Sequence, residues 1–245
     1  MDIATATHRR PPQPNPRTIP GVIDVWRADL SAAENYGLAE LLCVEERARA
    51  ERILDERKRA LWARSRGVLR ALLGRYLNAD PRELRFELGP HGKPALALRG
   101  QARQIPVLRF NLSHAGALML LAVTAEREVG VDVEHAHERY SAEFLRAWTM
   151  REAAVKCLGT GLGSAPITGE GSPGAVLWTA ELDAGPQTTA SLAVEGEQAC
   201  ELRCWDWPAE LRRDGRGVAS DSGGAVHERE LVGHLAQTWG GGVAL

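Results

Sequence analysis

The sequence of 245 residues predicts an α+β fold made of two similar α+β halves. The first observation is the order of elements: a strand, a helix and several strands are followed by a second strand, helix and set of strands. The second is an apolar stripe between Val44 and Leu77, which is typical of a helix that covers a core. The third is the alternation of valines over 129–134, which indicates a strand with one buried face. We therefore expect a pseudo-two-fold repeat, in which each half is a small antiparallel sheet packed on a long helix.

The first half is predicted over residues 21–126. It begins with a short apolar strand at 21–26 and continues into a helical region with a break near 55–58. The helix is expected to end at 78–81, because Pro81 cannot continue it. The helical region 44–77 carries nine arginines and one lysine against five acids, so its polar face is basic. The remaining elements of this half are predicted as strands at 84–88, 95–98, 110–112 and 117–123.

The second half is predicted over residues 127–208. Its first strand places Asp132 and Glu134 on the face opposite the valines. A helix follows that includes Trp148 and Lys156, and glycines from Gly159 onward end it. Three strands are expected at 176–182, 188–194 and 201–207. Residues 1–20 are predicted to form a flexible Pro-rich leader, and residues 209–245 a tail with a short helix at 227–239.

Composition limits the classes of function. The formal net charge is −2, which argues against a protein whose main task is to coat nucleic acid. No apolar run approaches the roughly 18 residues of a membrane span, so we expect no membrane partner. The leader lacks the apolar core of a signal peptide. The four cysteines show no Cys-x-x-Cys spacing, and free thiols in a reducing cytoplasm are the simplest account.

Acidic residues on the second half's first strand and helix predict a cation site. Glu152 and Lys156 are four residues apart and share one helix face. If this helix covers the acidic strand, then Asp132, Glu134 and Glu152 converge beside one ammonium. Such a cluster suits Mg²⁺ with a phosphate-rich ligand. The alternative is a solvated strand face and an ordinary helix-surface ion pair.

Two short motifs upstream are candidates for an anion site. Ser113-His114 follows a strand, and Lys93 lies in a Gly-Lys-Pro turn that presents its ammonium as a point charge. A Ser-His hydrolase is disfavoured because no Gly-x-Ser-x-Gly elbow is present. The alternatives are an exposed turn lysine and a histidine that caps a turn. For the basic helix, the alternative is a solvated face with ion pairs such as Glu45–Arg49.

The motifs taken in order resemble a known family. They are Gly-Lys-Pro-Ala-Leu, Phe-Asn-Leu-Ser-His, Val-Gly-Val-Asp-Val-Glu and Trp-Thr-x-x-Glu-Ala-x-x-Lys-x-x-Gly-x-Gly-Leu. In series they resemble the 4′-phosphopantetheinyl transferase superfamily, in its monomeric Sfp type that modifies peptide and polyketide synthases. The helix segment 65–73 is similar to the family's segment before its first motif. The resemblance covers roughly residues 21–208.

The resemblance implies an enzyme that moves the 4′-phosphopantetheine arm of coenzyme A to a serine of an apo carrier protein and releases 3′,5′-ADP. It implies an active site at the interface of the halves, in a cytoplasmic monomer that uses Mg²⁺, or Mn²⁺ as the alternative. It places Asp132, Glu134 and Glu152 on the metal, Lys156 and His114 on the pyrophosphate, Lys93 and Ser113 at the adenosine end, and Arg49 toward the 3′-phosphate. Glu152 or a metal-bound water would take the serine proton, since the nucleophile belongs to the partner.

The sequence departs from the family pattern at two places. Arg151 stands where the helix motif usually has lysine, which keeps the charge but changes its geometry. The connection 135–147 is much shorter than usual, and it offers only Glu138 and Glu143 as alternative bases. This shortening motivates a second hypothesis, a catalytically silent relative that still binds coenzyme A or a carrier protein. A third, a nucleic-acid binder that uses the basic helix, is disfavoured by the net charge.

Overall fold

The computed structural model describes residues 4–6, 9–10, 16–32, 37–97, 108–125, 127–160 and 176–207. The predicted tail 209–245 lies outside this part of the chain. The helical elements are η1 (Leu38–Leu41), α1 (Val44–Glu51), α2 (Glu56–Leu77), η2 (Pro81–Glu83) and α3 (Ala142–Leu158). The strands are β1 (Ala4–Ala6), β2 (Arg9–Arg10), β3 (Val22–Asp29), β4 (Phe86–Leu88), β5 (Pro94–Leu96), β6 (Leu108–Ala115), β7 (Leu118–Ala125), β8 (Val129–His135), β9 (Leu177–Leu182), β10 (Thr188–Glu195) and β11 (Glu201–Asp206).

The strands form three sheets, which confirms a mixed α+β fold. The first large sheet has the order β2-β11-β3-β7-β6, the second the order β1-β9-β10-β8, and β4 pairs with β5 in a small hairpin. Within the first sheet β3, β7 and β6 are antiparallel neighbours. Within the second, β8, β10 and β9 are antiparallel neighbours. Both sets therefore share one strand order: the strand that comes last in the chain, β7 or β10, lies in the middle and pairs with the other two.

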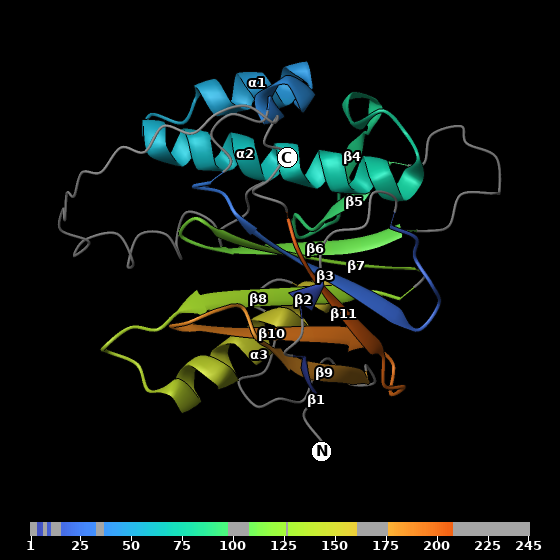
Figure 1. The fold of residues 1–245 in the computed structure, drawn as a ribbon, viewed down its shortest axis with the longest axis vertical. Coiled ribbons are helices and arrows are strands. Elements are labelled where there is room, and N and C mark those ends of the chain that lie inside the picture. The colour runs from blue at the N-terminus through green and yellow to red at the C-terminus, as the bar shows by residue number, and fades with distance from the viewer. Residues whose placement is uncertain are drawn as a thin grey trace.

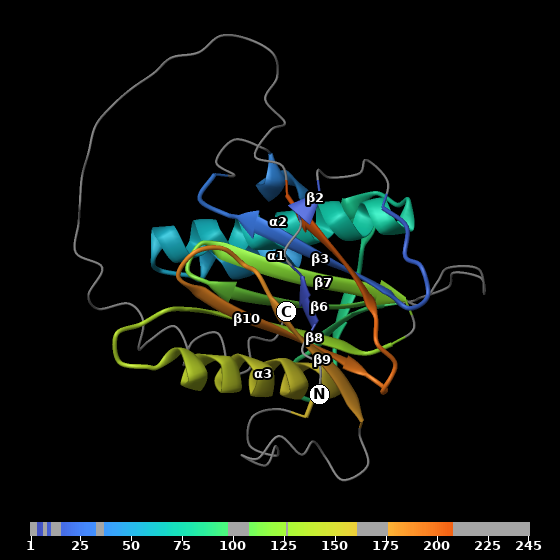
Figure 2. The ribbon, with the colours of Figure 1, turned by 60° about the horizontal axis from the view of Figure 1, so that its bottom comes forward.

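The two sheets lie between two long helices. Figures 1 and 2 show α2 on the outer face of the first sheet and α3 on the outer face of the second. On β7, Leu121 and Val123 belong to the core shared with α2, whereas Leu120 and Ala122 belong to the core between the sheets. Alternate side chains of β7 thus belong to two different apolar layers, as expected for a strand buried on both faces.

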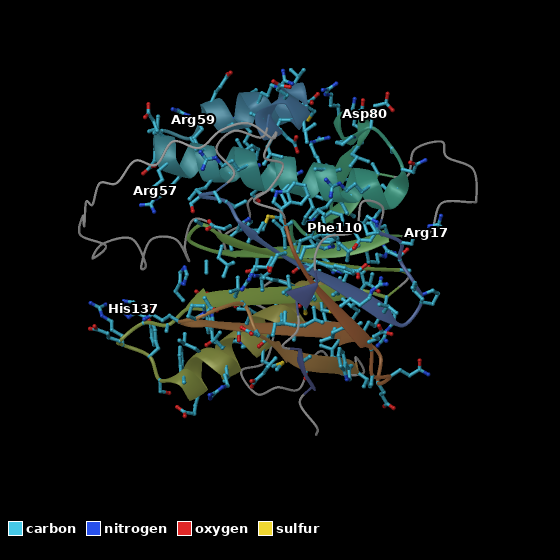
Figure 3. The ribbon with its side chains drawn as sticks, in the orientation of Figure 1. Arg17, Arg57, Arg59, Asp80, Phe110 and His137 are labelled. Carbon is cyan, nitrogen blue, oxygen red and sulfur yellow. The ribbon has the colours of Figure 1, made fainter. Side chains whose placement is uncertain are left out.

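The first helical region divides where the sequence predicts. Asp55 is the N-cap of α2, and its side chain accepts a hydrogen bond from the Lys58 backbone N–H at 2.9 Å. Asn78 ends the helix with a left-handed backbone (φ 49°). In Figure 3, Arg57 and Arg59 lie on the periphery of α2, whereas Phe110 of β6 lies inside the molecule. Phe110 packs in the core that α2 covers.

The N-terminal segment adds two short strands that the sequence did not predict, one to each large sheet. β1 pairs parallel to β9, and β2 pairs parallel to β11, so five residues of the predicted flexible leader are in strands. β11 follows the second set of strands in sequence but pairs parallel to β3 in the first sheet. An unpaired strand edge offers backbone hydrogen bonds to any extended segment that reaches it.

A buried carboxylate holds β11 in the first sheet. Asp24 of β3 accepts hydrogen bonds from the Arg203 guanidinium (Nε 2.8 Å), the Trp205 indole (2.8 Å) and the Tyr76 hydroxyl (2.7 Å). The Tyr76 hydroxyl in turn accepts from the Trp26 indole at 2.8 Å. The network joins β3, β11 and α2, and its hydrogen bonds compensate the desolvation of the carboxylate.

The connection before α3 is shorter than the sequence indicates. α3 begins at Ala142, six residues before Trp148, and Ser141 is its N-cap, accepting from the Phe144 N–H at 3.2 Å. His135 belongs to β8. Only residues 136–141 therefore lie outside both elements. The helix ends at Gly159 with a left-handed backbone (φ 64°), as predicted.

Candidate active site

Gly130 of β8 allows α3 to lie directly on the strand. A Cβ atom at this position would stand 2.0 Å from the Ala153 carbonyl oxygen and 2.3 Å from the Cys157 backbone nitrogen. Real side chains do not approach a backbone so closely, so only glycine permits this spacing. The close approach places the α3 face that carries Glu152 and Lys156 over the β8 face that carries Asp132.

Asp132 is the centre of the cluster. The residue is 3% exposed, and its Oδ1 atom accepts hydrogen bonds from Lys156 Nζ at 2.5 Å and from Ser113 Oγ at 2.8 Å. Lys156 Nζ also donates to Ser113 Oγ at 3.0 Å. The three residues come from β8, α3 and β6, so the contact joins the edges of both sheets. Asn111 reinforces the junction, because its Oδ1 accepts from the Val131 N–H at 2.9 Å.

Two carboxylate oxygens of this cluster are buried without a partner in the described part of the chain. They are Asp132 Oδ2 and Glu152 Oε1. A buried carboxylate oxygen without a hydrogen bond is costly, and a bound cation is one way to compensate that cost. The predicted contact of Asp132 with Lys156 is therefore present, whereas the convergence of Asp132, Glu134 and Glu152 on one metal ion stays a prediction.

Burial and neighbouring negative charges raise the pKa of two carboxyl groups in this cluster. Burial first, and then the charge of Asp132 and Glu152, raise the pKa of Glu134 to about 7, against the opposing effects of Lys156 and of a hydrogen bond from Trp148. Burial likewise raises the pKa of Glu152, with Asp132 adding to the rise. A nearby cation would reverse both effects, because it favours the charged carboxylates.

His114 lies beside the cluster but belongs to the α2 side of β6. Its Nε2 atom lies 2.7 Å from Ser65 Oγ of α2. Burial, followed by the charges of Lys156 and Arg66, lowers the pKa of His114 to about 3, so the ring is neutral at physiological pH. β6 extends through Ala115, so Ser113 and His114 lie within a strand and not after one.

Lys93 is engaged away from Asp132. Its Nζ atom pairs with Glu128 at 2.6 Å and donates to the carbonyl oxygens of Cys157 at 2.9 Å and Val129 at 3.1 Å. The ammonium thus caps the last turn of α3, where the helix dipole favours a positive charge. Its predicted contact with the adenosine end stays a prediction.

Three other predicted residues lie outside the Asp132 cluster. Arg49 of α1 stacks over the Trp62 ring at 5.7 Å, and burial lowers its pKa. Glu138 and Glu143 are exposed, and backbone and Ser141 hydrogen bonds lower the pKa of Glu143. Of the three candidate bases, Glu152 is the one that lies in the cluster.

Three aromatic rings that the sequence analysis did not single out form a stack with Trp148. His137, Tyr140, Phe144 and Trp148 follow one another with centroid distances of 5.9, 4.9 and 6.3 Å. Tyr140 is 50% and Phe144 47% exposed. His137 lies at the outer edge of the molecule in Figure 3. The spacing of four residues between Tyr140, Phe144 and Trp148 was a usable signal, since i and i+4 share a helix face.

A second charged cluster was also missed. Glu46 of α1 is 5% exposed, and its carboxylate accepts hydrogen bonds from Arg66 at 2.7 Å and from Arg70 at 2.6 Å. Both guanidinium groups stack on Phe86, at 4.7 and 5.2 Å. The basic face of α2 is therefore partly buried, contrary to the alternative of a wholly solvated face.

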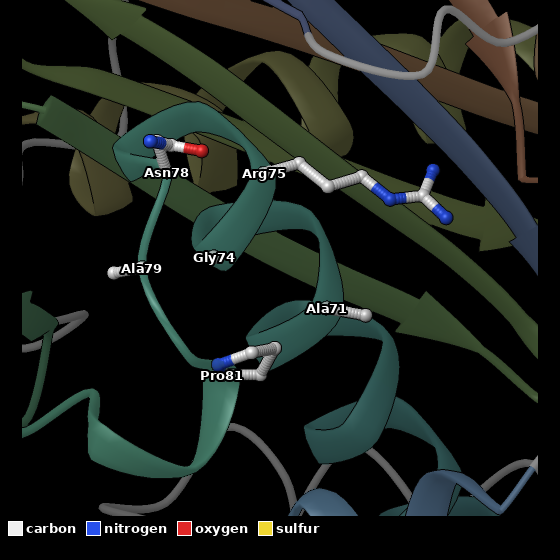
Figure 4. A pocket seen from close by; sticks show the side chains of 6 residues that line it. All are labelled: Ala71, Gly74, Arg75, Asn78, Ala79 and Pro81. Atoms are coloured by element: carbon white, nitrogen blue, oxygen red, sulfur yellow. The ribbon is translucent and has the colours of Figure 1, made fainter.

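A surface hollow of about 350 Å³ lies at the far end of α2. Figure 4 shows its lining, with Arg75, Asn78 and Pro81 around the end of the helix. Arg75 also stacks over the Trp207 ring at 5.0 Å. None of the predicted site residues lines this hollow, so it is separate from the cluster around Asp132.

The donors around Asp132 suit a hard cation in kind. Carboxylate oxygens are the ligands that Mg²⁺ prefers, and two of them are unpartnered here. Among the described residues, no three His, Cys, Asp or Glu side chains are already grouped as a metal site. Lys156 occupies one oxygen of Asp132. The residues fit a metal by their chemistry and by their free oxygens.

These features define a mixed α+β protein with a carboxylate-and-lysine site where two sheets meet. In the part of the chain that the structure describes, no helix is long and apolar enough to cross a bilayer.

Comparison with known proteins names the family. Residues 26–126 match the model of the 4′-phosphopantetheinyl transferase N-terminal family. The chain is 31% identical to the 4′-phosphopantetheinyl transferase HetI of a Nostoc species over 180 residues, which cover 62% of this chain and 75% of the relative. It is 28% identical to the 4′-phosphopantetheinyl transferase psf-1 of Bacillus pumilus over 195 residues, 69% of this chain and 75% of the relative. The chain belongs to the 4′-phosphopantetheinyl transferase family.

A human relative is more distant. The human L-aminoadipate-semialdehyde dehydrogenase-phosphopantetheinyl transferase is 25% identical over 151 residues, which cover 49% of this chain and 48% of the relative. The matches confirm the resemblance drawn from the ordered motifs and the prediction of an enzyme of this class.

Proposed function

We propose that the protein transfers the 4′-phosphopantetheine arm of coenzyme A to a serine of an apo acyl, peptidyl or aryl carrier protein and releases 3′,5′-ADP. Membership of the family supports the reaction class. The observation that supports the site most directly is the pair of unpartnered oxygens, on Asp132 and Glu152, beside the Lys156 ammonium. A polyanionic substrate with a divalent cation would satisfy both kinds of charge at once.

Asp132, Glu134 and Glu152 are the residues that would hold Mg²⁺, or Mn²⁺ as the alternative. The bound ion would act as a Lewis acid and neutralise charge on the pyrophosphate. The support is chemical: all three are carboxylates, and the burial that raises the pKa of Glu134 and Glu152 would be compensated by a cation.

The anion contacts are assigned to residues around this centre. Lys156 and His114 would bind the pyrophosphate, and Ser113 the adenosine end. Lys93 and Arg49 are assigned to the adenosine end and the 3′-phosphate by the resemblance. Their observed partners, Glu128 and Trp62, are protein groups, so these two assignments have the least support.

The nucleophile belongs to the carrier protein, so this chain needs to supply a base and an orientation. Glu152 is our candidate base because it lies in the cluster and burial raises its pKa. A base with a raised pKa accepts a proton more readily near neutral pH. The alternatives, Glu138 and Glu143, are exposed.

We also infer that the two α+β halves are related by a pseudo-two-fold axis with the site at their interface. The shared strand order of the two sheets supports this, as does the contact of Ser113 with Asp132 across the sheet edges. The division into 21–126 and 127–208, the monomeric state and the cytoplasmic location stay predictions.

Mass spectrometry of candidate carriers tests the reaction. The protein is incubated with coenzyme A, Mg²⁺ and a panel of apo carrier proteins, and each carrier is weighed intact. We expect the mass of one phosphopantetheine arm to be added to at least one carrier, and none to a carrier whose acceptor serine is alanine. If coenzyme A binds but no carrier gains mass, the transfer proposal is wrong.

The short connection at 136–141 favours a second candidate function, a silent relative that binds coenzyme A or a carrier without transfer. Grafting a full-length family connection between β8 and α3 distinguishes the two. Activity that appears only in the graft supports the silent relative, whereas turnover by the wild-type protein excludes it.

A further inference from the structure

Two contacts about one helical turn apart hold α3 on the second sheet. At the first, the backbone of Ala153 lies directly on Gly130 of β8. At the second, four residues earlier in the helix, Thr149 Oγ1 lies 2.8 Å from Ser191 Oγ of β10. A single contact would leave the helix able to tilt about it. The two together fix both the position and the tilt of α3 on the strands.

Ser191 is the neighbour of Asp132 in this sheet. The two residues stand opposite each other in the antiparallel pairing of β10 with β8, and opposite residues have their side chains on the same face. On this face Asp132 meets Lys156 of α3, and Ser191 meets Thr149. Glu152 lies on the helix between Thr149 and Lys156. The contact of the two hydroxyls therefore holds the part of α3 that carries Glu152 beside the strand that carries Asp132.

Packing alone does not require two hydroxyl groups at this place. Thr149 and Ser191 are completely buried, and a buried polar group is costly unless it is hydrogen-bonded. The Thr149 hydroxyl donates to the Arg146 carbonyl oxygen of its own helix at 3.2 Å, as helical threonines commonly do. Since a hydroxyl has one proton, Ser191 is the donor in its contact with Thr149. This hydrogen bond sets a distance and a direction between α3 and β10, which an apolar contact would leave adjustable.

We propose that Thr149 and Ser191 form a positioning pair, which fixes α3 on β10 so that Glu152 faces the same divalent cation as Asp132. This inference rests on the proposed function of the site. Neither hydroxyl is a ligand in this role, and both act through the placement of Glu152. The competing explanation is a purely structural contact, which would contribute to stability and leave cation binding unchanged.

Titration with Mn²⁺, followed by the electron paramagnetic resonance signal of the free ion, tests the pair without turnover. Ser191→Ala removes the donated proton but leaves Thr149 bonded to Arg146, so no buried hydroxyl loses its only partner. We expect this variant to weaken Mn²⁺ binding about tenfold, the lower end of the effect of residues that orient metal ligands. Thr149→Ser keeps the hydroxyl and should bind Mn²⁺ as the wild-type protein does. Equal Mn²⁺ affinity of Ser191→Ala and wild type overturns the proposal.

Leu192→Val is the matched control for general destabilisation. Leu192 is the next residue on β10, and it points to the opposite face, where it packs in the core between the sheets. This variant should lower the unfolding midpoint and leave Mn²⁺ affinity unchanged, and a loss of affinity like that of Ser191→Ala overturns the proposal. Thr149→Val is the second variant. It leaves the Ser191 hydroxyl buried without this partner, so it should lower the midpoint more than Ser191→Ala does and weaken Mn²⁺ binding as much.

Steady-state kinetics with an apo carrier separate positioning from a loss of folded protein. Ser191→Ala should need about tenfold more Mg²⁺ for half of its maximal rate, with a kcat at saturating Mg²⁺ close to that of wild type. A lower kcat with unchanged Mg²⁺ dependence overturns the proposal, because a smaller folded fraction gives that result. If Mn²⁺ binding changes as expected but no carrier is modified, the positioning role stands and the transfer proposal fails. A wild type that binds neither ion overturns both.

Discussion

Two buried charge clusters lie in this molecule, one between α1 and α2 and the other around Asp132 of β8, and they are built on opposite plans. In the first, both carboxylate oxygens of Glu46 are hydrogen-bonded, by Arg66 and Arg70. Arg70 also donates to the carbonyl oxygens of Pro81 and Leu84. In the second, Asp132 Oδ1 is shared by Lys156 and Ser113, while Asp132 Oδ2 and Glu152 Oε1 are without partners among the described residues.

The difference separates a structural cluster from a binding site. In the Glu46 cluster the carboxylate is satisfied by two guanidinium groups, and these three residues hold α1 on α2. In the Asp132 cluster Lys156 pairs with one oxygen of Asp132, and oxygens of Asp132 and Glu152 are left without partners among the described residues, so hydrogen-bonding capacity remains for a ligand. Buried charge by itself does not mark a site, whereas buried charge that the protein does not satisfy does.

The largest expected effect is on activity. Asp132→Asn keeps the size of the side chain but removes its charge, and it should lower kcat/KM by more than about a hundredfold, the scale of losing one electrostatic contact to a reacting group. The unfolding midpoint of the metal-free protein should not fall, because repulsion with Glu134 and Glu152 is relieved. Carrier modification at the wild-type rate would contradict the assignment of the acidic cluster.

The equivalent change in the other cluster should act on stability. Glu46→Gln leaves two guanidinium groups buried without their partner and should cost about 3–5 kcal/mol of unfolding free energy, measured by urea denaturation. Burial alone would raise the pKa of Glu46, but Arg70 and Arg66 lower it overall. Its stabilisation is therefore present above the ordinary carboxyl pKa and is lost as the pH falls. Glu45→Gln, at an exposed position one residue away, is the control and should leave the midpoint unchanged.

The stability of the Asp132 cluster should depend on both pH and Mg²⁺. The pKa of Glu134 is raised from 4.5 to about 7. Below about pH 4.5 this carboxyl is protonated in the folded and the unfolded protein, so it does not change the stability of the metal-free protein. As the pH rises through 7 the folded protein has to bury its charge and loses stability. Glu134→Gln should raise the metal-free melting temperature at pH 8 but not at pH 5. Mg²⁺ should stabilise the wild-type protein more at pH 8 than at pH 5, and an equal shift at both would argue against carboxylate ligation.

The smallest effect is expected at Lys93, which lies outside both clusters. Lys93→Met removes the pair with Glu128 and the cap on α3, and should lower the unfolding free energy by about 1 kcal/mol. If the clamp is its whole role, the KM for coenzyme A stays within twofold of wild type. A rise well beyond that would support the adenosine contact implied by the resemblance. Glu128→Gln is the matched variant, since it breaks the same pair from the other side.

The sequence predicted the second cluster better than the first for a physical reason. Alternation put Asp132 and Glu134 on one face of a strand, and a four-residue spacing put Glu152 with Lys156. These are local rules, and the one long-range assumption was that the helix covers the strand, which the structure shows at the close approach of α3 to Gly130. The same local rules mispredict the first cluster. Arg66 and Arg70 are four residues apart, which indicates repulsion, and only Glu46, twenty residues upstream, makes their burial favourable.

Other long-range features were also beyond local rules. The contact of Ser65 with His114 joins residues 49 positions apart, and β11 crosses to the first sheet although its sequence continues the second set of strands. Fold class, strand bounds in the second half and the metal-ligand candidates depended on periodicity and ordered motifs. Side-chain partners depended on packing, which single-sequence patterns do not specify.

The crossing of β11 has a consequence for how the chain can be divided. A break between β7 and β8 would leave β3 without its β11 neighbour, and would leave β9 without β1. Neither piece would hold a complete sheet, and each would carry a strand that only the other can accept. If the chain were cut at this point, the two fragments would restore both sheets only by reassociating. The pairing of β11 with β3 and of β1 with β9 would make that reassociation specific.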